Sequence, residues 1–374
     1  MQRDADSVLE TAREFDLGGD VTDINGHTAG HINDTYIVTV QKGSVRRRYT
    51  LQRINAAVFK RPDLVMHNIM VVTETIKRKN EERGGDPELG GLSLIPTSEG
   101  RHYLVDRAGD SWRCYRYIEG VTYDRVTCDR RGMNITGEAA GAFARFQNHL
   151  GDVDLRDVHT TIEDFHNTPQ RFRRLCEVAA EDRLGRARLA RREIEFVLSR
   201  EPICATITGP LSRGELPTRV AHNDTKINNV IFDDKAAYGP RALCVIDLDT
   251  VMPGSALFDF GDLVRSSVCP RPEDETDLDT IAIDTGLFEA IVKGFLEGAD
   301  IGLAEEEIRL TVPSSMVITF ETGLRFLTDF LAGDVYFRTA RPEHNLDRAR
   351  MQFRLLCSME RMKNEMEDIV GRHA

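Results

Sequence analysis

The sequence has few of the features that define specialised classes of protein. Its seven cysteines are odd in number and scattered, and none forms a CxxC pair, so neither a disulfide framework nor a zinc ribbon is expected. No apolar run approaches the length that spans a bilayer, and residues 1–15 are polar and amphipathic rather than a secretory signal. We therefore expect a cytoplasmic protein with no membrane partner.

An excess of positive charge is also missing. The chain of 374 residues has a formal net charge of -12, which argues against nucleic-acid binding through broad phosphate contacts. Its apolar content of 41% and charged content of 29% are those of an ordinary globular protein. The length allows two packed units with a sizeable core.

Secondary-structure patterns change their character near Glu119-Gly120. Before this point, β-type runs lie at residues 24–40, 46–55, 92–95, 103–106 and 112–118, with helical patterns at 7–16 and 62–80. After it, helical patterns lie at residues 134–150, 170–184, 187–200, 285–297, 305–332 and 345–369, interrupted by β-rich runs at 218–232 and 243–248. This order predicts an α+β protein with a β-rich lobe over residues 1–120 and an α-rich lobe over residues 121–374.

The segment HNDTKINN, at residues 222–229, has the HxDxKxxN spacing of the protein-kinase catalytic loop. Phosphoryl transfer needs a carboxylate that orients the acceptor hydroxyl and takes its proton, and we assign this role to Asp224. Lys226 would supply a cation near the migrating phosphoryl group, and Asn229 a neutral oxygen ligand for Mg²⁺. His222 is expected to brace the loop. The alternative is a polar turn between two strands.

A second signal is the buried-type strand Leu243–Ile246, which ends in Asp247-Leu248-Asp249. A kinase places its main magnesium aspartate at the end of a strand soon after the catalytic loop, and Mg²⁺ takes one or two carboxylates together with substrate phosphates. We expect Asp247 to be the principal ligand and Asp249 a second one. For Asp249 alone, a strand-end turn residue is an equally good interpretation. The two signals together predict a bilobal protein-kinase-like fold.

The literal DFG triplet of the chain lies further on, at residues 259–261. No apolar strand leads into it, and Leu263-Val264 looks like the start of a helix. We therefore interpret this segment as a support for the catalytic loop, with Asp262 accepting hydrogen bonds from backbone donors.

The first lobe is expected to bind ATP. Residues 25–36, NGHTAGHINDTY, lie between two strands as a phosphate-covering loop does, and they supply the candidate contacts Gly30, His31 and Asn33. An ordinary hairpin would look much the same, because only two glycines are present.

The next strand departs from the kinase pattern. By register, Gln52 replaces the lysine that pairs with the nucleotide phosphates, with Arg53 beside it. Either Arg53 or another cation substitutes, or Gln52 suffices. Tyr117 and Ile118 open a segment that fits a hinge whose backbone meets the adenine edge.

With these residues in place, the chain resembles the aminoglycoside phosphotransferase and choline kinase superfamily. Within it, the chain is most similar to bacterial N-acetylhexosamine 1-kinases, over nearly its whole length. The matching segments are GHINDTY (30–36), FHNTPQRF (165–172), HNDTKINN (222–229), IDLDTVMPGS (246–255), LFDFGDLVR (257–265), GLRFLTDFLAGDVYF (323–337) and PEHNL (342–346).

The resemblance implies transfer of the ATP γ-phosphoryl group to the anomeric hydroxyl of GlcNAc or GalNAc, with Mg²⁺ as cofactor. It implies that Asp224 is the base, that Asn229 and Asp247 bind the metal, and that Arg325 and Tyr336 face the sugar. It also implies that the absent strand lysine is no sign of a dead enzyme.

Arg325 has a structural alternative. It lies beside an apolar helical stripe, so its stem would pack while its head pairs with Glu321 or Asp329, each four residues away.

Other functions fit the same fold, because one scaffold hosts many activities. The acceptor would be an aminoglycoside, choline or homoserine in one alternative, and the acidic run at residues 273–275 would then be offered to a cationic acceptor. That run is more typical of a solvated loop. A pseudokinase is the other alternative, and the intact Asp224, Lys226, Asn229 and Asp247 argue against it.

Overall fold

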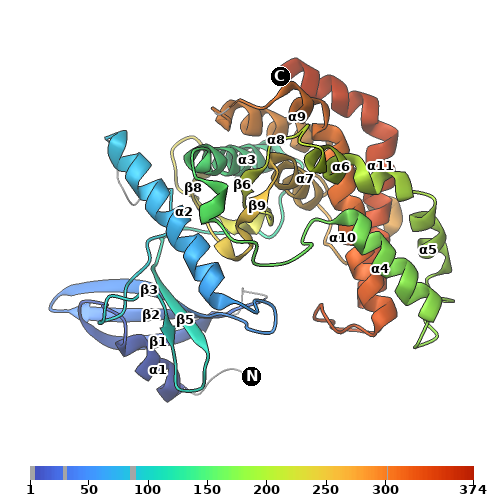
Figure 1. The fold of residues 1–374 in the computed structure, drawn as a ribbon. Helices are drawn as coiled ribbons and strands as arrows, with labels where there is room; N and C mark the ends of the chain where they lie inside the picture. Colours follow the sequence, from blue (N-terminus) through green and yellow to red (C-terminus); the bar gives the residue numbers. More distant parts are fainter. Residues whose placement is uncertain (1–4, 28–31, 85–89, 301) are drawn as a thin grey trace.

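The computed structural model describes residues 5–27, 32–84, 90–300 and 302–374. Figure 1 shows two parts, a small body built on a β-sheet and a larger helical body. This arrangement confirms the predicted α+β class and the bilobal protein-kinase-like architecture.

The small body is an antiparallel sheet with the strand order β1-β2-β3-β5-β4. Its strands are β1 (Asp20–His27), β2 (Asp34–Lys42), β3 (Val45–Arg53), β4 (Leu104–Val105) and β5 (Ser111–Arg116), and α1 (Ala5–Arg13) packs beside them. One face carries a separate apolar core that includes Val38, Leu51 and Trp112. Because side chains alternate along a strand, Gln52 and Arg113 lie on the opposite face.

Helix α2 (Pro62–Glu82) connects the sheet to the helical body (Figure 1). Pro62 stands at its first position, where the missing N–H costs no hydrogen bond. The buried Asn68 side chain donates to the carbonyls of His159 (2.7 Å) and Val251 (2.9 Å). These bonds tie α2 to segments of the helical body.

The large body is built around one extended apolar core. Its helices are α3 (Arg130–Leu150), α4 (Thr168–Glu181), α5 (Arg191–Leu198), α6 (Ala205–Ser212), α7 (Ala256–Ser267), α8 (Thr285–Gly298), α9 (Glu305–Arg309), α10 (Thr311–Ala332) and α11 (His344–His373). A Cβ atom at Gly294 of α8 would lie 2.2 Å from the carbonyl oxygen of Gly137 in α3. The close packing of these two helices therefore depends on glycine at residue 294.

Two short antiparallel ladders lie within this body. They are β6 (Arg219–Ala221) with β9 (Met252–Gly254), and β7 (Val230–Asp233) with β8 (Arg241–Val245). They hold the loop of residues 222–229 and the segment of residues 246–251 side by side.

Several predicted elements differ from the structure. Helix α7 begins at Ala256, earlier than expected, because Ser255 caps it by accepting a hydrogen bond from the amide of Leu257. The pattern over residues 305–332 forms two helices that meet at Leu310. The strand predicted at residues 92–95 is wrong, because this segment makes only an isolated bridge to β5.

Helix α6 was not predicted. In the part of the chain that the structure describes, none of the helices has the length and apolar character needed to cross a membrane.

Candidate active site

The loop of residues 222–229 is fixed by hydrogen bonds to Asp259, the aspartate of the DFG triplet. Its fully buried carboxylate accepts hydrogen bonds from the backbone amides of His222 (3.0 Å) and Asn223 (2.7 Å) and from the side-chain amide of Gln147 in α3 (2.6 Å). Asn223 has a φ of 64°, in the left-handed region. The two hydrogen bonds from these backbone amides to Asp259 stabilise this uncommon backbone conformation.

The supporting role predicted for this segment is therefore correct, but the residue predicted to perform it is wrong. Asp262 accepts a hydrogen bond from Arg265, 2.8 Å away, and its second oxygen has no partner among the described residues. Asp259 faces the loop because it lies one helical turn earlier, in the first turn of α7.

His222 braces the loop, as expected. Its ring is buried against Phe143 and Phe146, and its Nε2 lies 2.9 Å from the carbonyl oxygen of Ile246. The amide of Asp224 donates to its Nδ1 (3.3 Å). The imidazole thus links the loop to the segment that carries Asp247.

The three candidate catalytic residues lie together at the end of the loop. Lys226 Nζ lies 3.1 Å from Asp224 Oδ2, and Asn229 Nδ2 donates to the carbonyl (2.8 Å) and to the carboxylate (3.1 Å) of Asp224. Burial opposes ionisation of Asp224, but the positive charge of the neighbouring Lys226 favours it, and the pKa of the carboxyl group is lowered. The carboxylate is therefore ionised at neutral pH and held in place.

Asp247 lies two residues after the end of β8 at Val245, with a φ of 62°. Loss of hydration inside the site, together with repulsion by the carboxylates of Asp249 and Asp224, raises the pKa of Asp247 to about 6. Its side chain has no hydrogen-bond or ion-pair partner among the described residues and is still reached by solvent. A carboxylate in this state fits a cation that arrives from solvent.

Asp247 and Asn229 offer oxygen atoms, which are the ligands that Mg²⁺ takes in proteins. No group of three or more His, Cys, Asp or Glu side chains that would hold a metal occurs within the described residues. Magnesium needs fewer protein ligands, because substrate phosphates and water complete its coordination. Asp247 and the amide oxygen of Asn229, whose nitrogen is engaged by Asp224, meet that requirement.

Asp249 has a different environment. It is buried, and its two oxygens are engaged by Arg113 of β5 and by Asn33 Nδ2. Asn33 also accepts the amide of Asn55 through Oδ1 (3.0 Å). The candidate nucleotide contacts Asn33 and Gln52 thus lie near Asp249, whereas Gly30 and His31 fall outside the described residues.

The predicted hinge follows β5. The amide of Tyr117 donates to the carbonyl of Arg48 (3.2 Å), and Ile118 is half-buried. A Cβ atom at Gly120 would lie 2.7 Å from the carbonyl oxygen of Phe232. The hinge therefore runs directly against β7, which follows the catalytic loop.

A cavity of about 450 Å³ contains both residues assigned to the sugar. The guanidinium of Arg325 lies 5.4 to 6.0 Å from the ring centroids of Phe165, Tyr336 and Phe337. Arg325 pairs with neither Glu321 nor Asp329, and it has no ion pair within the described part of the chain. The ion pair expected by the structural alternative is therefore absent from the described residues, and the head of Arg325 lies over aromatic rings instead.

The acids near Arg325 are engaged elsewhere. Asp329 accepts the amides of Val335, Tyr336 and Phe337 at 2.8 to 3.0 Å, which fixes the turn after the left-handed Gly333. This turn brings Tyr336 back to the helix face that carries Arg325.

His166, which follows the cavity residue Phe165, joins the catalytic loop to helix α10, which carries Arg325. Its Nε2 lies 3.1 Å from the carbonyl oxygen of Asn223, and its Nδ1 lies 2.9 Å from Glu321 in α10. Arg171 also lines the cavity and donates to the carbonyl of Phe165. Burial and the charge of Arg325 lower the pKa of Arg171 to about 10. These residues belong to the FHNTPQRF segment, but its sequence alone did not indicate their roles.

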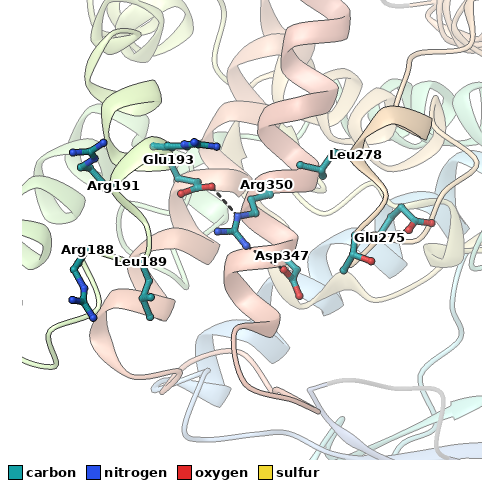
Figure 2. A pocket seen from close by; sticks show the side chains of 10 residues that line it. Arg188, Leu189, Arg191, Glu193, Glu275, Leu278, Asp347 and Arg350 are labelled. Carbon is teal, nitrogen blue, oxygen red and sulfur yellow. Dashed lines mark hydrogen bonds and ion pairs between the residues drawn. The ribbon is translucent and has the colours of Figure 1, made fainter.

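A larger cavity, of about 760 Å³, lies elsewhere in the helical body (Figure 2). Its central Arg350 pairs with Glu193 (2.8 Å) and lies 3.6 Å from Asp347. None of the candidate catalytic or metal residues lines this cavity. The same is true of the cavity of about 450 Å³, but that cavity is lined by Phe165, which adjoins His166, and His166 Nε2 lies 3.1 Å from a carbonyl oxygen of the catalytic loop.

The fold and this site together define a phosphotransferase that acts on small molecules. The chain belongs to the phosphotransferase enzyme family (APH), which it matches over residues 23–291.

Solved structures share the fold at low sequence identity. An aminoglycoside phosphotransferase from Alicyclobacillus acidocaldarius is 13% identical, with a TM-score of 0.58 and 98% of each chain covered. A microcompartment-associated aminopropanol kinase is 14% identical, with a TM-score of 0.58, and covers 97% of this chain and 99% of its own. A choline kinase from Cryptosporidium parvum is 13% identical, with a TM-score of 0.56, and covers 98% of this chain and 97% of its own.

Proposed function

We propose that this phosphotransferase is an ATP- and Mg²⁺-dependent kinase that phosphorylates the anomeric hydroxyl of N-acetylhexosamines, GlcNAc or GalNAc. The product is the sugar 1-phosphate. The observation that carries the proposal is the His166 bridge, which joins the Asp224 loop to helix α10; this helix carries Arg325, which lines a cavity together with aromatic rings.

In this proposal, residues 1–120 bind ATP and residues 121–374 supply the chemistry. Asp224 accepts the proton of the acceptor hydroxyl, and Lys226 stabilises the negative charge that the phosphoryl group carries. Asn229 and Asp247 would hold Mg²⁺, which neutralises phosphate charge when bound. Tyr117 and Ile118 provide backbone groups for the adenine.

The cavity favours a neutral acceptor rich in oxygen atoms. The guanidinium of Arg325 offers a planar fork of donors, and it is free of acidic partners among the described residues. The flanking rings of Phe165 and Tyr336 provide apolar faces of the kind on which a sugar ring packs. Hydroxyl and N-acetyl oxygens are suitable acceptors for these donors.

A cationic acceptor such as choline or an aminoglycoside is less well served. Arg171, Arg174 and Arg325 line the cavity together with Glu163, Asp164 and Asp329, so the lining has no excess of negative charge to attract a cation. The acidic run at residues 273–275 is not free to bind such an acceptor. Glu273 pairs with Arg265 (3.2 Å), and Asp274 pairs with Arg341 (3.0 Å).

A coupled assay of ADP release tests the proposal across GlcNAc, GalNAc, galactose, choline and kanamycin. We expect the two N-acetylhexosamines to give the highest kcat/KM. A higher value for choline or kanamycin would show that the acceptor assignment is wrong. No release with any acceptor, despite ATP binding, would favour the pseudokinase.

A further inference from the structure

We propose that Arg113, on β5, is the cation that supports the nucleotide phosphates in this chain, in place of the strand lysine that Gln52 replaces. This inference rests on the ATP binding proposed above. It also assigns a role to Asp249, which anchors Arg113 instead of binding the metal.

The position of Arg113 follows from the register of the sheet. Gln52 and Arg113 are direct cross-strand partners on β3 and β5, so their side chains share the face that looks toward the helical body. Arg113 Nε donates to Gln52 Oε1 (3.0 Å), while its Nη1 pairs with Asp249. The guanidinium therefore reaches from the site of the missing lysine to the segment that carries Asp247.

The neighbouring arginine is not available for this role. Arg53 points to the other face of the sheet, where it pairs with Asp34 and, at 3.0 Å, with Asp110. Both pairs lie within the small body and hold its strands together. Of the two arginines beside Gln52, only Arg113 faces the candidate metal and phosphate region.

Arg113 stays protonated at physiological pH, and its guanidinium is held in one orientation by Gln52 and Asp249. Its side chain is 1% exposed, and that of Asp249 is 2% exposed. Burial opposes the charge, but Asp249, Tyr115 and Asp247 outweigh it and raise the pKa of the guanidinium.

Asp249 completes the arrangement. One of its oxygens pairs with Arg113, and the other accepts from Asn33 Nδ2 at 2.6 Å. With both oxygens engaged, this carboxylate fixes the orientation of the arginine, much as an acidic partner fixes the strand lysine of a kinase. Asp247 and Asn229 are then left as the protein ligands for magnesium.

The test compares nucleotides that differ only in their phosphates. Binding of ATP, ADP and adenosine to the full chain is measured by isothermal titration calorimetry, without an acceptor. We expect Arg113→Gln to weaken ATP binding about 10- to 100-fold, the usual effect of losing a hydrogen bond to a charged group. Adenosine binding should stay unchanged, and the exposed Arg47→Gln variant serves as the control for lost charge.

A second variant keeps the test valid if Arg113→Gln does not fold, since a lone buried Asp249 is destabilising. Arg113→Gln/Asp249→Asn removes both charges and should show the same selective loss. Adding Gln52→Lys to it should recover at least tenfold of the ATP affinity, because the lysine returns to its usual strand.

Two outcomes would overturn the role of Arg113. One is a folded variant that binds ATP as wild type does, and the other is an equal loss for adenosine and ATP. Wild-type protein that binds neither ATP nor ADP would instead refute the nucleotide site itself, and this role with it.

Discussion

The Nδ1 atom of His166 lies 2.9 Å from Glu321 Oε1, and both side chains are buried. Glu321 also accepts a hydrogen bond from Thr168 Oγ1 (2.6 Å), and the other ring nitrogen of His166 faces the Asn223 carbonyl. Helix α10, which carries Arg325, is thereby fixed to the catalytic loop. These bonds to the Glu321 carboxylate hold the helix and the loop in one relative position.

We expect Glu321→Gln to lower the free energy of unfolding at pH 7 by about 1 to 3 kcal/mol, since it weakens bonds to a charged group. Burial opposes ionisation, but His166, Arg171 and Thr168 outweigh it and lower the pKa of Glu321. Wild-type stability from this group is therefore fully present above the unfolded pKa, about 4.3, and is lost as pH falls from there through the lower pKa of the folded state.

Urea unfolding of both proteins at pH 7 and below pH 4.5 checks whether the stabilisation by Glu321 decreases in acid. The gap between wild type and Glu321→Gln should narrow in acid, whereas the exposed Glu365→Gln variant should match wild type at both pH values. A gap that widens in acid would contradict the assignment.

Asp224→Asn should lower kcat by about 10² to 10⁴-fold, the usual contribution of general-base assistance. The asparagine keeps the size of the side chain and its place beside Asn229, so the ATP dissociation constant should change little. Single-turnover kinetics and ATP titration measure the two quantities. The control is Asp279→Asn, at an almost fully exposed residue. A variant that retains half the wild-type kcat would remove Asp224 from the role of base.

The two aspartates that compete for the metal role make opposite predictions. Asp247→Asn should raise the Mg²⁺ concentration needed for half-maximal rate and lower kcat, because it removes the unpaired carboxylate. Asp259→Asn should mainly lower the melting temperature, because it disturbs the bonds to His222 and Asn223. Magnesium titrations and thermal melts of both variants decide between them. A larger magnesium shift in the Asp259 variant would reverse the assignment.

The catalytic loop was predictable from sequence because its parts are local. Asp224, Lys226 and Asn229 lie within six consecutive residues, so their spacing alone indicates shared chemistry. Asp247 was proposed as a metal ligand because a strand pattern leads directly to it, and this role stays a prediction. The two-lobe architecture followed from a change in pattern that extends over many residues.

Relationships across the chain were not predictable in this way. Arg113 meets Asp249 only because β5 pairs with β3, and His166 meets Glu321 only because α4 packs on α10. Asp262 was chosen over Asp259 because the first turn of α7 was not recognised, and with it the residue that points at the loop. Each case depends on tertiary packing rather than on local spacing.

Arg325→Lys keeps the charge in the acceptor cavity but loses the planar fork of donors. We expect kcat/KM for GlcNAc to fall about 10- to 100-fold, with the KM for ATP and the melting temperature near wild type. Arg174→Lys is the matched control, since Arg174 lines the same cavity but is exposed and lies 3.2 Å from Glu177. If Arg325→Lys instead melts early and keeps its GlcNAc KM, Arg325 is a structural residue.

The most direct test of the account is the identity of the product. Wild-type protein is incubated with ATP, Mg²⁺ and GlcNAc, and the sugar is examined by ¹H and ³¹P NMR. The account predicts a phosphate ester at the anomeric carbon, visible as coupling between phosphorus and the anomeric proton, and absent with Asp224→Asn. A phosphate at another hydroxyl, or unmodified GlcNAc under conditions where choline or kanamycin is phosphorylated, would contradict it.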